Sequence, residues 1–323
     1  MAGQIARTAA ALIAAAAATL ATAQSYPTKP IKFIVPFPPA GSTDLSARAV
    51  AGKLGERIGQ PVIIENRPGA GGNIGTDVVA KSQPDGYTLI VGTVGTHGIN
   101  PSLYSKMPYD HVKDFAPVIL LSKTPNVLVV NPSLPVNSVA DVIKLAKSKP
   151  NELTFASSGS GTSIHLSGEL FKTMAGVQMT HIPYKGSGPM LIDLISGQVN
   201  MAFDNLSAAM QHIKAGKLKA LATTGTQRPP NLPDVPTIAE AGLAGYDSTS
   251  WNAIFAPAGT PPAVIDRLNR EIRAILESPD TRKFFTEQGA EAGGGTPAEL
   301  AEFVRAETAK WQKVVKDSGA KVD

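Results

Sequence analysis

Short apolar runs alternate with amphipathic stretches along almost the whole chain. Each run is long enough for one buried strand, and apolar residues recur at helical spacing in most of the stretches between them. Strands are predicted at Ile31–Val35, Val62–Glu65, Thr88–Val91, Val118–Leu121, Val127–Val130, Leu153–Ala156, Met179–Ile182, Val199–Phe203 and Leu218–Ala222. This alternation predicts an α/β protein whose parallel or mixed sheets carry helices on both faces.

Three of the intervening stretches show clear helix signals. Helices are predicted to begin near Ser42 and near Thr162. A third is predicted at Pro189–Ser196, because proline favours the first helical position and Gly197 follows the last. The residues expected to be buried are Leu45, Ala49, Leu54 and Ile58 in the first helix, and Leu166, Leu170 and Met174 in the second.

The pattern changes after Trp251. A strand-like segment, Ala253–Ala256, precedes two long charged stretches. Their spacing predicts helices at Val264–Glu277 and Pro297–Lys316.

The first 23 residues have the composition of an export signal. Arg7 is their only charged residue, an apolar run spans Ala9–Leu20, and the small-x-small sequence Ala21-Thr22-Ala23 follows. The run is shorter than the ~20 apolar residues that a membrane-spanning helix needs. We expect a signal peptide, residues 1–23, cleaved near Ala23. Because no cysteine lies at the cleavage site, we expect the mature protein to be free in the periplasm.

Removal of this segment leaves 300 of the 323 residues, which is enough for two domains of ordinary size. No later segment is apolar for long enough to span a membrane, so we expect a soluble mature protein. No repeat and no low-complexity linker divides the chain. We therefore expect two lobes joined by crossing strands, with lobe 1 formed by residues 24–124 and 248–323 and lobe 2 by residues 125–247.

Charge and cysteine content exclude several classes of function. The formal net charge is +4, and the lysines are scattered rather than gathered in a basic stripe with aromatic residues. We therefore expect no binding of nucleic acid. The chain has no cysteine, which excludes thiol catalysis, iron–sulfur clusters and zinc sites built from thiolates.

Three loops place glycine, serine and threonine where a predicted strand ends and a predicted helix begins. They are residues 36–44, 157–163 and 184–189. Ligands bind at this edge of open α/β sheets, and free amides at a helix N-terminus suit a carboxylate or phosphate. Any one loop is explained as well by a tight turn with a Ser or Thr cap. Three of them in two halves of one chain favour a shared anion site.

Motifs of nucleotide-binding proteins and hydrolases are incomplete. Gly69–Gly75 has the spacing G-x-G-x-x-x-G rather than that of a dinucleotide fingerprint, and no P-loop sequence is present. Gly161–His165 approaches a nucleophile elbow but has histidine in place of the second glycine. The five histidines are dispersed, so we expect no metal and no cofactor. A structural role as the cap of the following helix explains Asp204 as well as a role in ligand binding does.

The chain resembles the Bug proteins, the TctC-like periplasmic substrate-binding components of tripartite tricarboxylate transporters. The resemblance covers essentially all of the mature sequence, including N-R-P-G-A-G-G-N-I-G at 66–75 and F-A-P-A-G-T-P at 255–261. The other blocks lie at residues 36–44, 100–104, 158–169, 183–186, 203–205 and 235–237. One departure is Ala40, where a glycine pair with Gly41 is more usual, and the extra methyl group restricts that turn.

The resemblance implies a two-lobed periplasmic-binding-protein (Venus-flytrap) fold, in which each lobe is a doubly wound sheet flanked by helices. It implies capture of a small organic carboxylate in the cleft, partly through ordered water, and delivery to the membrane subunits of a tripartite tricarboxylate transporter. Family ligands are dicarboxylates, tricarboxylates, acidic amino acids and aromatic carboxylates. We expect a monomer that catalyses nothing. By position, the implied ligand contacts are Phe37, Ala40, Gly41, Ser42, Thr43, Thr96 and His97 in lobe 1, and Ser158, Ser163, His165, Tyr184, Gly186 and Asp204 in lobe 2.

Two other functions remain compatible with the sequence. A hydrolase or transferase could use the same helix termini for an oxyanion, but it needs a nucleophile with a paired base, which the motifs do not supply. A ligand-binding sensor for a membrane kinase needs only binding and closure. The sequence does not separate such a sensor from a transport receptor.

Overall fold

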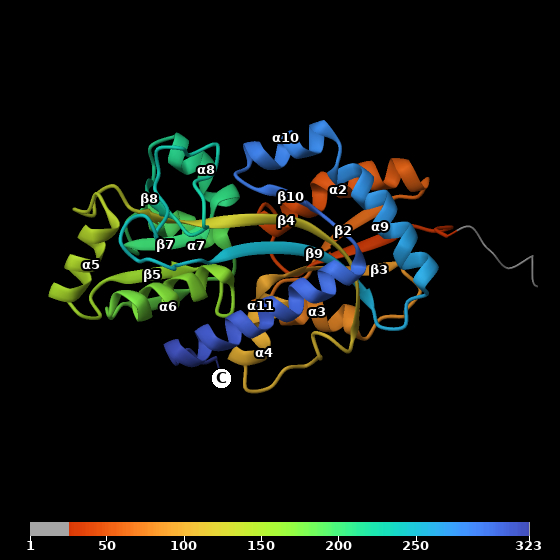
Figure 1. Ribbon diagram of the computed structural model, residues 1–323, viewed down its shortest axis with the longest axis horizontal. Coiled ribbons are helices and arrows are strands. Elements are labelled where there is room, and N and C mark those ends of the chain that lie inside the picture. The colour runs from red at the N-terminus through yellow and green to blue at the C-terminus, as the bar shows by residue number, and fades with distance from the viewer. Residues whose placement is uncertain (1–25, 323) are drawn as a thin grey trace, which may run out of the picture.

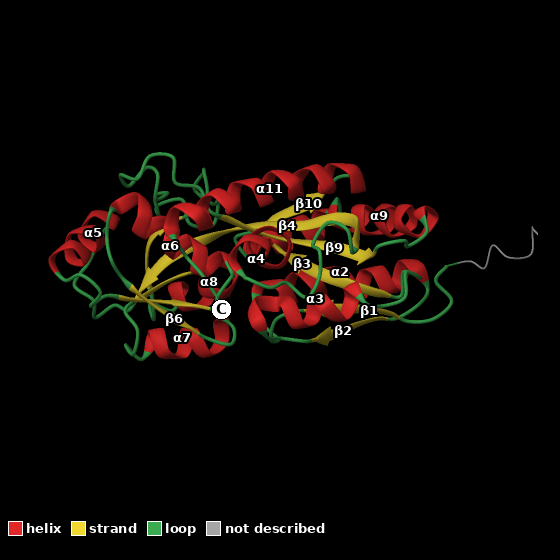
Figure 2. Cartoon of the chain, turned by 90° about the horizontal axis from the view of Figure 1, so that it is seen from below, coloured by secondary structure: helices red, strands yellow, loops and turns green. Residues whose placement is uncertain are grey.

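The computed structural model describes residues 26–322, so the predicted signal peptide lies outside the described residues. The strands form a mixed sheet in the order β2-β1-β3-β9-β4-β7-β5-β6, and β8 and β10 also pair with β4. Figures 1 and 2 show two lobes in which helices cover the sheet. Within the described part of the chain, no helix is both long and apolar enough to cross a membrane. The predicted fold class, a two-lobed α/β protein, is confirmed.

Helices and strands alternate along most of the chain, and the longest connection between two of them joins β8 to β9. The N-terminal part of lobe 1 contains β1 (Ile31–Val35), α2 (Ser42–Ile58), β2 (Val62–Asn66), α3 (Asn73–Ala80), β3 (Thr88–Thr93), the π-helical turn η2 (Gly95–Ile99) and α4 (Asn100–Leu103). The strand β4 (Phe115–Val130) leads into lobe 2, with α5 (Val139–Ser148), β5 (Thr154–Ser157), α6 (Ser163–Ala175), β6 (Thr180–Pro183), α7 (Ser187–Ile195), β7 (Met201–Asn205), α8 (Leu206–Lys214) and β8 (Lys219–Thr223). The strand β9 (Thr249–Pro257) returns to lobe 1, with α9 (Pro262–Leu276), α10 (Pro279–Glu287), β10 (Glu291–Gly294) and α11 (Pro297–Ser318).

The antiparallel strands β4 and β9 cross between the lobes (Figure 1). The prediction of two separate strands at 118–121 and 127–130 is wrong, because the polar residues between them continue the strand. Ser122 is fully buried, and its Oγ lies 3.1 Å from Ser46 Oγ. Asn126 is likewise fully buried. A buried polar stretch inside a strand is invisible to a search for apolar runs.

We propose the division of the chain that the sequence suggested, with residues 26–124 and 248–322 in lobe 1 and residues 125–247 in lobe 2. The distribution of apolar core residues supports it. The four clusters of buried apolar side chains divide between the lobes in this way, except that Leu166 of α6 packs among lobe 1 residues. Helix α6 therefore contributes to contacts between the lobes.

Helix α2 presents a different face to the core from the one predicted. Its buried apolar residues are Ala47, Val50, Ala51, Leu54 and Ile58. The predicted burial of Leu45 and Ala49 is wrong, since both are only half-buried. The side of α2 that faces the core carries Ala47 and Ala51 rather than Leu45, because the helix packs between the sheet and α9.

Helix α6 shows the same effect. Leu166 is buried as predicted, but Leu170 is half-buried and Met174 is 37% exposed. The face that packs on the sheet passes through Gly168, where a Cβ would collide with the ring of Phe155. The predicted burial of Met174 is therefore wrong. The side of α6 that packs on the sheet is the one that contains Gly168, where the ring of Phe155 comes close to the helix, and Met174 does not lie on that side.

Candidate functional site

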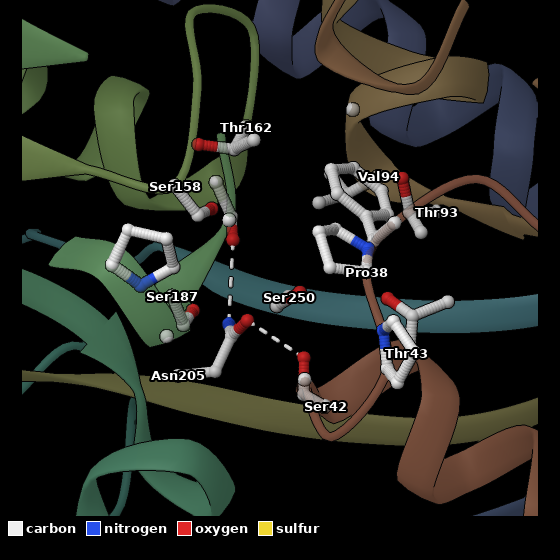
Figure 3. A pocket seen from close by; sticks show the side chains of 18 residues that line it. Pro38, Ser42, Thr43, Thr93, Val94, Ser158, Thr162, Ser187, Asn205 and Ser250 are labelled. Carbon is white, nitrogen blue, oxygen red and sulfur yellow. Dashed lines mark hydrogen bonds between the residues drawn. The ribbon is translucent and has the colours of Figure 1, made fainter. Parts of the chain in front are cut away.

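A cavity opens between the lobes where the three loops meet (Figure 3). Together with its opening to solvent, it comprises about 640 Å³ of space free of protein atoms. Its wall is formed by Phe37, Pro38, Pro39, Gly41, Ser42, Thr43, Thr93, Val94, Gly95, Ser158, Thr162, Ser163, Gly186, Ser187, Gly188, Pro189, Asn205 and Ser250. Both lobes and the crossing strand β9 therefore contribute to the lining.

The N-termini of three helices, α2, α6 and α7, reach this wall. Gly41 and Gly186, the N-cap residues of α2 and α7, provide no side-chain cap, whereas Thr162 caps α6 by accepting from the His165 N–H. The first backbone N–H groups of a helix have no partner within the helix, and its N-terminus carries about half a positive charge. The uncapped amides of α2 and α7 are therefore suited to hold an anion.

A hydrogen bond joins the two lobes across the cavity (Figure 3). Ser42 Oγ, at the start of α2, donates to Asn205 Oδ1 at 2.8 Å. Asn205 Nδ2 donates to Asn126 Oδ1 on the crossing strand and, at 3.5 Å, to Ser163 Oγ at the start of α6. Asn205 thus connects the start of α2 in lobe 1 with the crossing strand β4 and with the start of α6 in lobe 2.

The lining is polar but uncharged. Among the described residues that form the wall, none has an ionisable acidic or basic side chain. Hydroxyls of serine and threonine and the Asn205 amide supply hydrogen bonds, and prolines, Phe37 and Val94 supply apolar contact. Lys185, the cation of the third loop, is exposed and does not line the cavity. The cavity is therefore suited to an anion with a short carbon chain, held without an ion pair.

Asp44 holds the first loop in shape. Its carboxylate accepts hydrogen bonds from the Ala40 N–H at 3.0 Å, from Arg48 Nε at 2.8 Å and from Asn66 Nδ2 at 3.0 Å. Burial opposes ionisation, but the hydrogen bonds from Arg48, Ala40 and Asn66 outweigh it and lower the pKa of Asp44. Asp44 stays ionised and supports the N-terminus of α2 from behind.

The structure brings about half of the sequence-predicted contacts together at the cavity. Those that line it are Phe37, Gly41, Ser42, Thr43, Ser158, Ser163 and Gly186. Those that do not line it are Ala40, Thr96, His97, His165, Tyr184 and Asp204. The second group lies directly behind the wall or at its edge.

Thr96 and His97 lie in the π-helical turn η2 and are fully buried. The His97 ring stacks on Phe255 with 4.0 Å between ring centroids, and its Nδ1 lies 2.8 Å from Thr96 Oγ1. Burial lowers the pKa of His97 to about 3, so the ring is neutral. The cavity wall is instead formed by Thr93 and Val94, which precede this turn, and by Gly95, its first residue.

The lobe 2 residues outside the wall support it. His165 stacks on His181 at 4.0 Å and its Nδ1 accepts from the Gly161 N–H, which fixes the second loop. Tyr184 donates its hydroxyl to Asp193 at 2.8 Å. Asp204 lies behind Ser187, whose hydroxyl donates to Asp204 Oδ1 at 2.9 Å.

Several lining residues were not predicted from the sequence. Thr93, Val94 and Gly95 follow a predicted strand, so the rule that ligands bind at strand ends could have found them. Asn205 lies two residues after the predicted strand Val199–Phe203. Ser250 lies within the crossing strand β9, and no sequence pattern singles it out. The remaining ones, Pro38, Pro39, Thr162, Ser187, Gly188 and Pro189, lie within the three predicted loops.

No group of three or more acidic or histidine side chains among residues 26–322 is arranged to hold a metal ion. His165 Nε2 lies 3.8 Å from Glu169 Oε1, and the ring of His181 stacks on that of His165. Glu169 instead accepts from Lys172 Nζ at 2.9 Å. The carboxylate is therefore occupied by a lysine.

Comparison with known proteins places this chain in a family. Residues 46–320 match the family described as "Tripartite tricarboxylate transporter family receptor". Protein BugT of Bordetella pertussis is 42% identical over 302 residues, which is 93% of each chain. The R. palustris protein Rpa4515, solved with adipate, is 46% identical with a TM-score of 0.90, over 92% of this chain and 100% of that chain. MatC from Rhodopseudomonas palustris, solved with bound malate, is 36% identical with a TM-score of 0.86, over 90% of this chain and 100% of the other.

Proposed function

Because the chain belongs to the tripartite tricarboxylate transporter receptor family, we propose that it captures a small organic carboxylate in the interlobe cavity and delivers it to the membrane subunits of such a transporter. The observation that carries the proposal is the cavity itself. Uncapped helix N-termini, hydroxyls and one amide converge from two lobes on a space with no ionisable side chain in its described wall. Such a site favours an anion that brings several hydrogen-bond acceptors.

Hydrogen bonds of this kind are strong enough for micromolar binding of a carboxylate. Hydrogen bonds to a charged group contribute about 1.5–3 kcal/mol each. About four or five of them give about 6–15 kcal/mol before the costs of ordering and association are subtracted. The remainder is compatible with a micromolar Kd, which corresponds to about −8 kcal/mol.

The ligand class is proposed from the relatives and from the wall of the cavity. Two solved relatives carry adipate and malate. Phe37, Val94 and the prolines give the cavity an apolar side that fits the carbon chain of such a dicarboxylate. Tricarboxylates, acidic amino acids and aromatic carboxylates are the other classes to screen.

We also propose that the protein binds without chemical turnover, as a monomer in the periplasm. Ser163, the serine within the motif that resembles a nucleophile elbow, is within reach of the Asn205 amide rather than of a base. His165 is stacked and buried, and burial lowers its pKa to about 2.

Intact-mass analysis of the periplasmic fraction should find a chain that begins at or near Gln24, and a full-length chain in the cytoplasm would contradict export.

The function is tested by a thermal-shift screen of organic acids followed by solution scattering. A ligand at about 100 times its Kd should stabilise the protein by about 2.7 kcal/mol. Saturation with the organic acid that stabilises the protein most should make the protein more compact, because the two lobes close on the ligand. No stabilisation by any carboxylate, or the appearance of a product over time, would contradict a binding protein of this class.

A further inference from the structure

Asp204, the penultimate residue of β7, places a carboxyl group one hydrogen bond behind the cavity wall. Its side chain is fully buried. Oδ1 accepts from Ser187 Oγ and from the Asn205 N–H, both at 2.9 Å. Ser187 and Asn205 both line the cavity. Among the described residues, Oδ2 has no hydrogen-bond partner. A carboxyl group with one unpartnered oxygen therefore lies beside the proposed anion site.

No charged neighbour compensates this carboxyl group. Within residues 26–322, no lysine, arginine or histidine forms a hydrogen bond or ion pair with Asp204. Helices α6, α7 and α8 and strands β4 and β5 pack against β7. The titratable side chains on these elements are Lys123 on β4, His165, Glu169 and Lys172 on α6, Asp193 on α7, and His212 and Lys214 on α8. Burial raises the pKa of Asp204 to about 7, against the opposing effect of the hydrogen bonds from Ser187 and Asn205.

An anion in the cavity further disfavours the ionised form of Asp204. The wall contains no cation to screen the two negative charges from each other. Like charges close together in a poorly solvated site favour protonation of one of them. The carboxylate of a ligand is held by several hydrogen bonds, whereas Asp204 Oδ2 has none, so Asp204 is the group that takes the proton.

Ser187 gives a second reason for this assignment. A serine hydroxyl has a single hydrogen to donate. When Asp204 is ionised, Ser187 donates that hydrogen to Asp204 Oδ1 and can only present a lone pair to the cavity. When Oδ1 carries a proton, it can donate to Ser187 Oγ, and the Ser187 hydrogen becomes available to the ligand carboxylate. Protonation of Asp204 thus turns Ser187 from an acceptor into a donor on the ligand side.

We propose that a carboxylate ligand enters this cavity together with one proton, which is bound by Asp204. The proton comes from solvent or buffer, one O–H bond forms on the Asp204 carboxylate, and no other covalent bond changes. The inference rests on the proposed function, because it requires an anionic ligand in the cavity. It makes ligand affinity depend on pH in a range where a dicarboxylate ligand is itself fully ionised.

The test is isothermal titration calorimetry with adipate and with malate, in buffers of low and high ionisation enthalpy at about pH 8. The dependence of the heat on the buffer gives the number of protons taken up. Because burial raises the pKa of Asp204 to about 7 without ligand and a neighbouring anion raises that pKa further, we expect uptake of at least about half a proton per ligand at that pH. The affinity should be at least about tenfold weaker at about pH 9 than at about pH 6.5. Burial lowers the pKa of His165 to about 2 and that of His181 to about 4, so neither group contributes in this range.

Two variants assign the proton. Asp204→Asn keeps an oxygen that can accept from Ser187 and Asn205, and it should bind the ligand with proton uptake near zero and with an affinity that varies little with pH. Glu152→Gln removes a carboxylate from an exposed position in lobe 2, and it should behave as the wild type does. Binding without proton uptake by the wild type would overturn the inference and leave the proposed function intact. Uptake that persists in Asp204→Asn would also overturn it. A wild-type protein that binds no carboxylate at all would overturn the proposed function and this inference with it.

Discussion

The burial of Asp204 has a measurable consequence for stability in the absence of ligand. Its pKa is raised from 3.8 to about 7, chiefly by burial. A carboxyl group whose folded-state pKa is raised binds more protons in the folded state, so its contribution to stability is complete below about pH 4 and is lost as the pH rises to about 7. The slope is about 1.4 kcal/mol for each pH unit between the two pKa values and vanishes above about pH 7, so the loss between about pH 5 and about pH 8 is about 3 kcal/mol. Asp204→Asn removes this loss.

Urea denaturation of the wild type and of Asp204→Asn at these two pH values measures the effect. The difference in unfolding free energy between the two proteins should shift by about 3 kcal/mol in favour of the variant as the pH is raised. This double difference cancels any constant cost of the amide group and any other group that titrates in both proteins. Parallel pH profiles for the two proteins would show that Asp204 ionises freely in the folded state, and the reasoning from burial would then be wrong.

Two further substitutions test the geometry of the loops. Ala40 has a φ of 67°, in the left-handed region, which costs a non-glycine residue about 1–2 kcal/mol, while glycine loses about 0.5–1 kcal/mol through its freer unfolded state. Ala40→Gly should therefore stabilise the protein slightly, by about 0.5 kcal/mol, and a clear loss of stability in urea denaturation would contradict the backbone assignment. Lys185 is exposed and lies outside the cavity wall, so Lys185→Ala should weaken carboxylate binding by less than about tenfold, or about 1.4 kcal/mol. Loss of binding in calorimetry would show that a lysine ion pair holds the ligand.

The strands of the two lobes could be predicted well because parallel strands buried on both faces are continuous apolar runs. Ile31–Val35 is found with the predicted bounds. The crossing strand β4 could not be predicted in one piece, because its middle carries buried polar residues such as Ser122 and Asn126. Those residues are satisfied by partners from distant parts of the chain, and such pairings are absent from any local pattern.

The residues of the candidate site also divide into those with a local sequence signal and those placed by tertiary contacts. Ser42, Ser163 and Gly186 could be placed at the cavity because a strand end followed by a helix start is a local signal. The family resemblance indicated Thr96 and His97, but the π-helical turn buries both and leaves Thr93 to Gly95 at the wall. Ser250 reaches the cavity only because β9 crosses between the lobes. Positions of that kind depend on tertiary contacts, so the sequence alone does not reveal them.

The central claim is that a small carboxylate binds in the cavity at the N-terminus of α2, and Gly41→Val tests it most directly. Gly41 lines the cavity with a φ of −77°, which valine can adopt, and an added Cβ would have only Pro38 O within 4 Å, at 3.7 Å. A valine side chain would therefore occupy ligand space without a steric conflict in the backbone. Gly52→Val, on the same helix with no atom within 4 Å of an added Cβ, is the matched control.

The measurement is calorimetric titration of the two variants and the wild type with adipate and malate, after unfolding curves have shown that all three are folded. The wild type and Gly52→Val should bind at least one of these acids with similar affinity. Gly41→Val should bind at least about 100-fold more weakly, which corresponds to about 2.7 kcal/mol. Equal affinity in Gly41→Val and the wild type would contradict the account, because the carboxylate would then be held somewhere other than the cavity between the lobes.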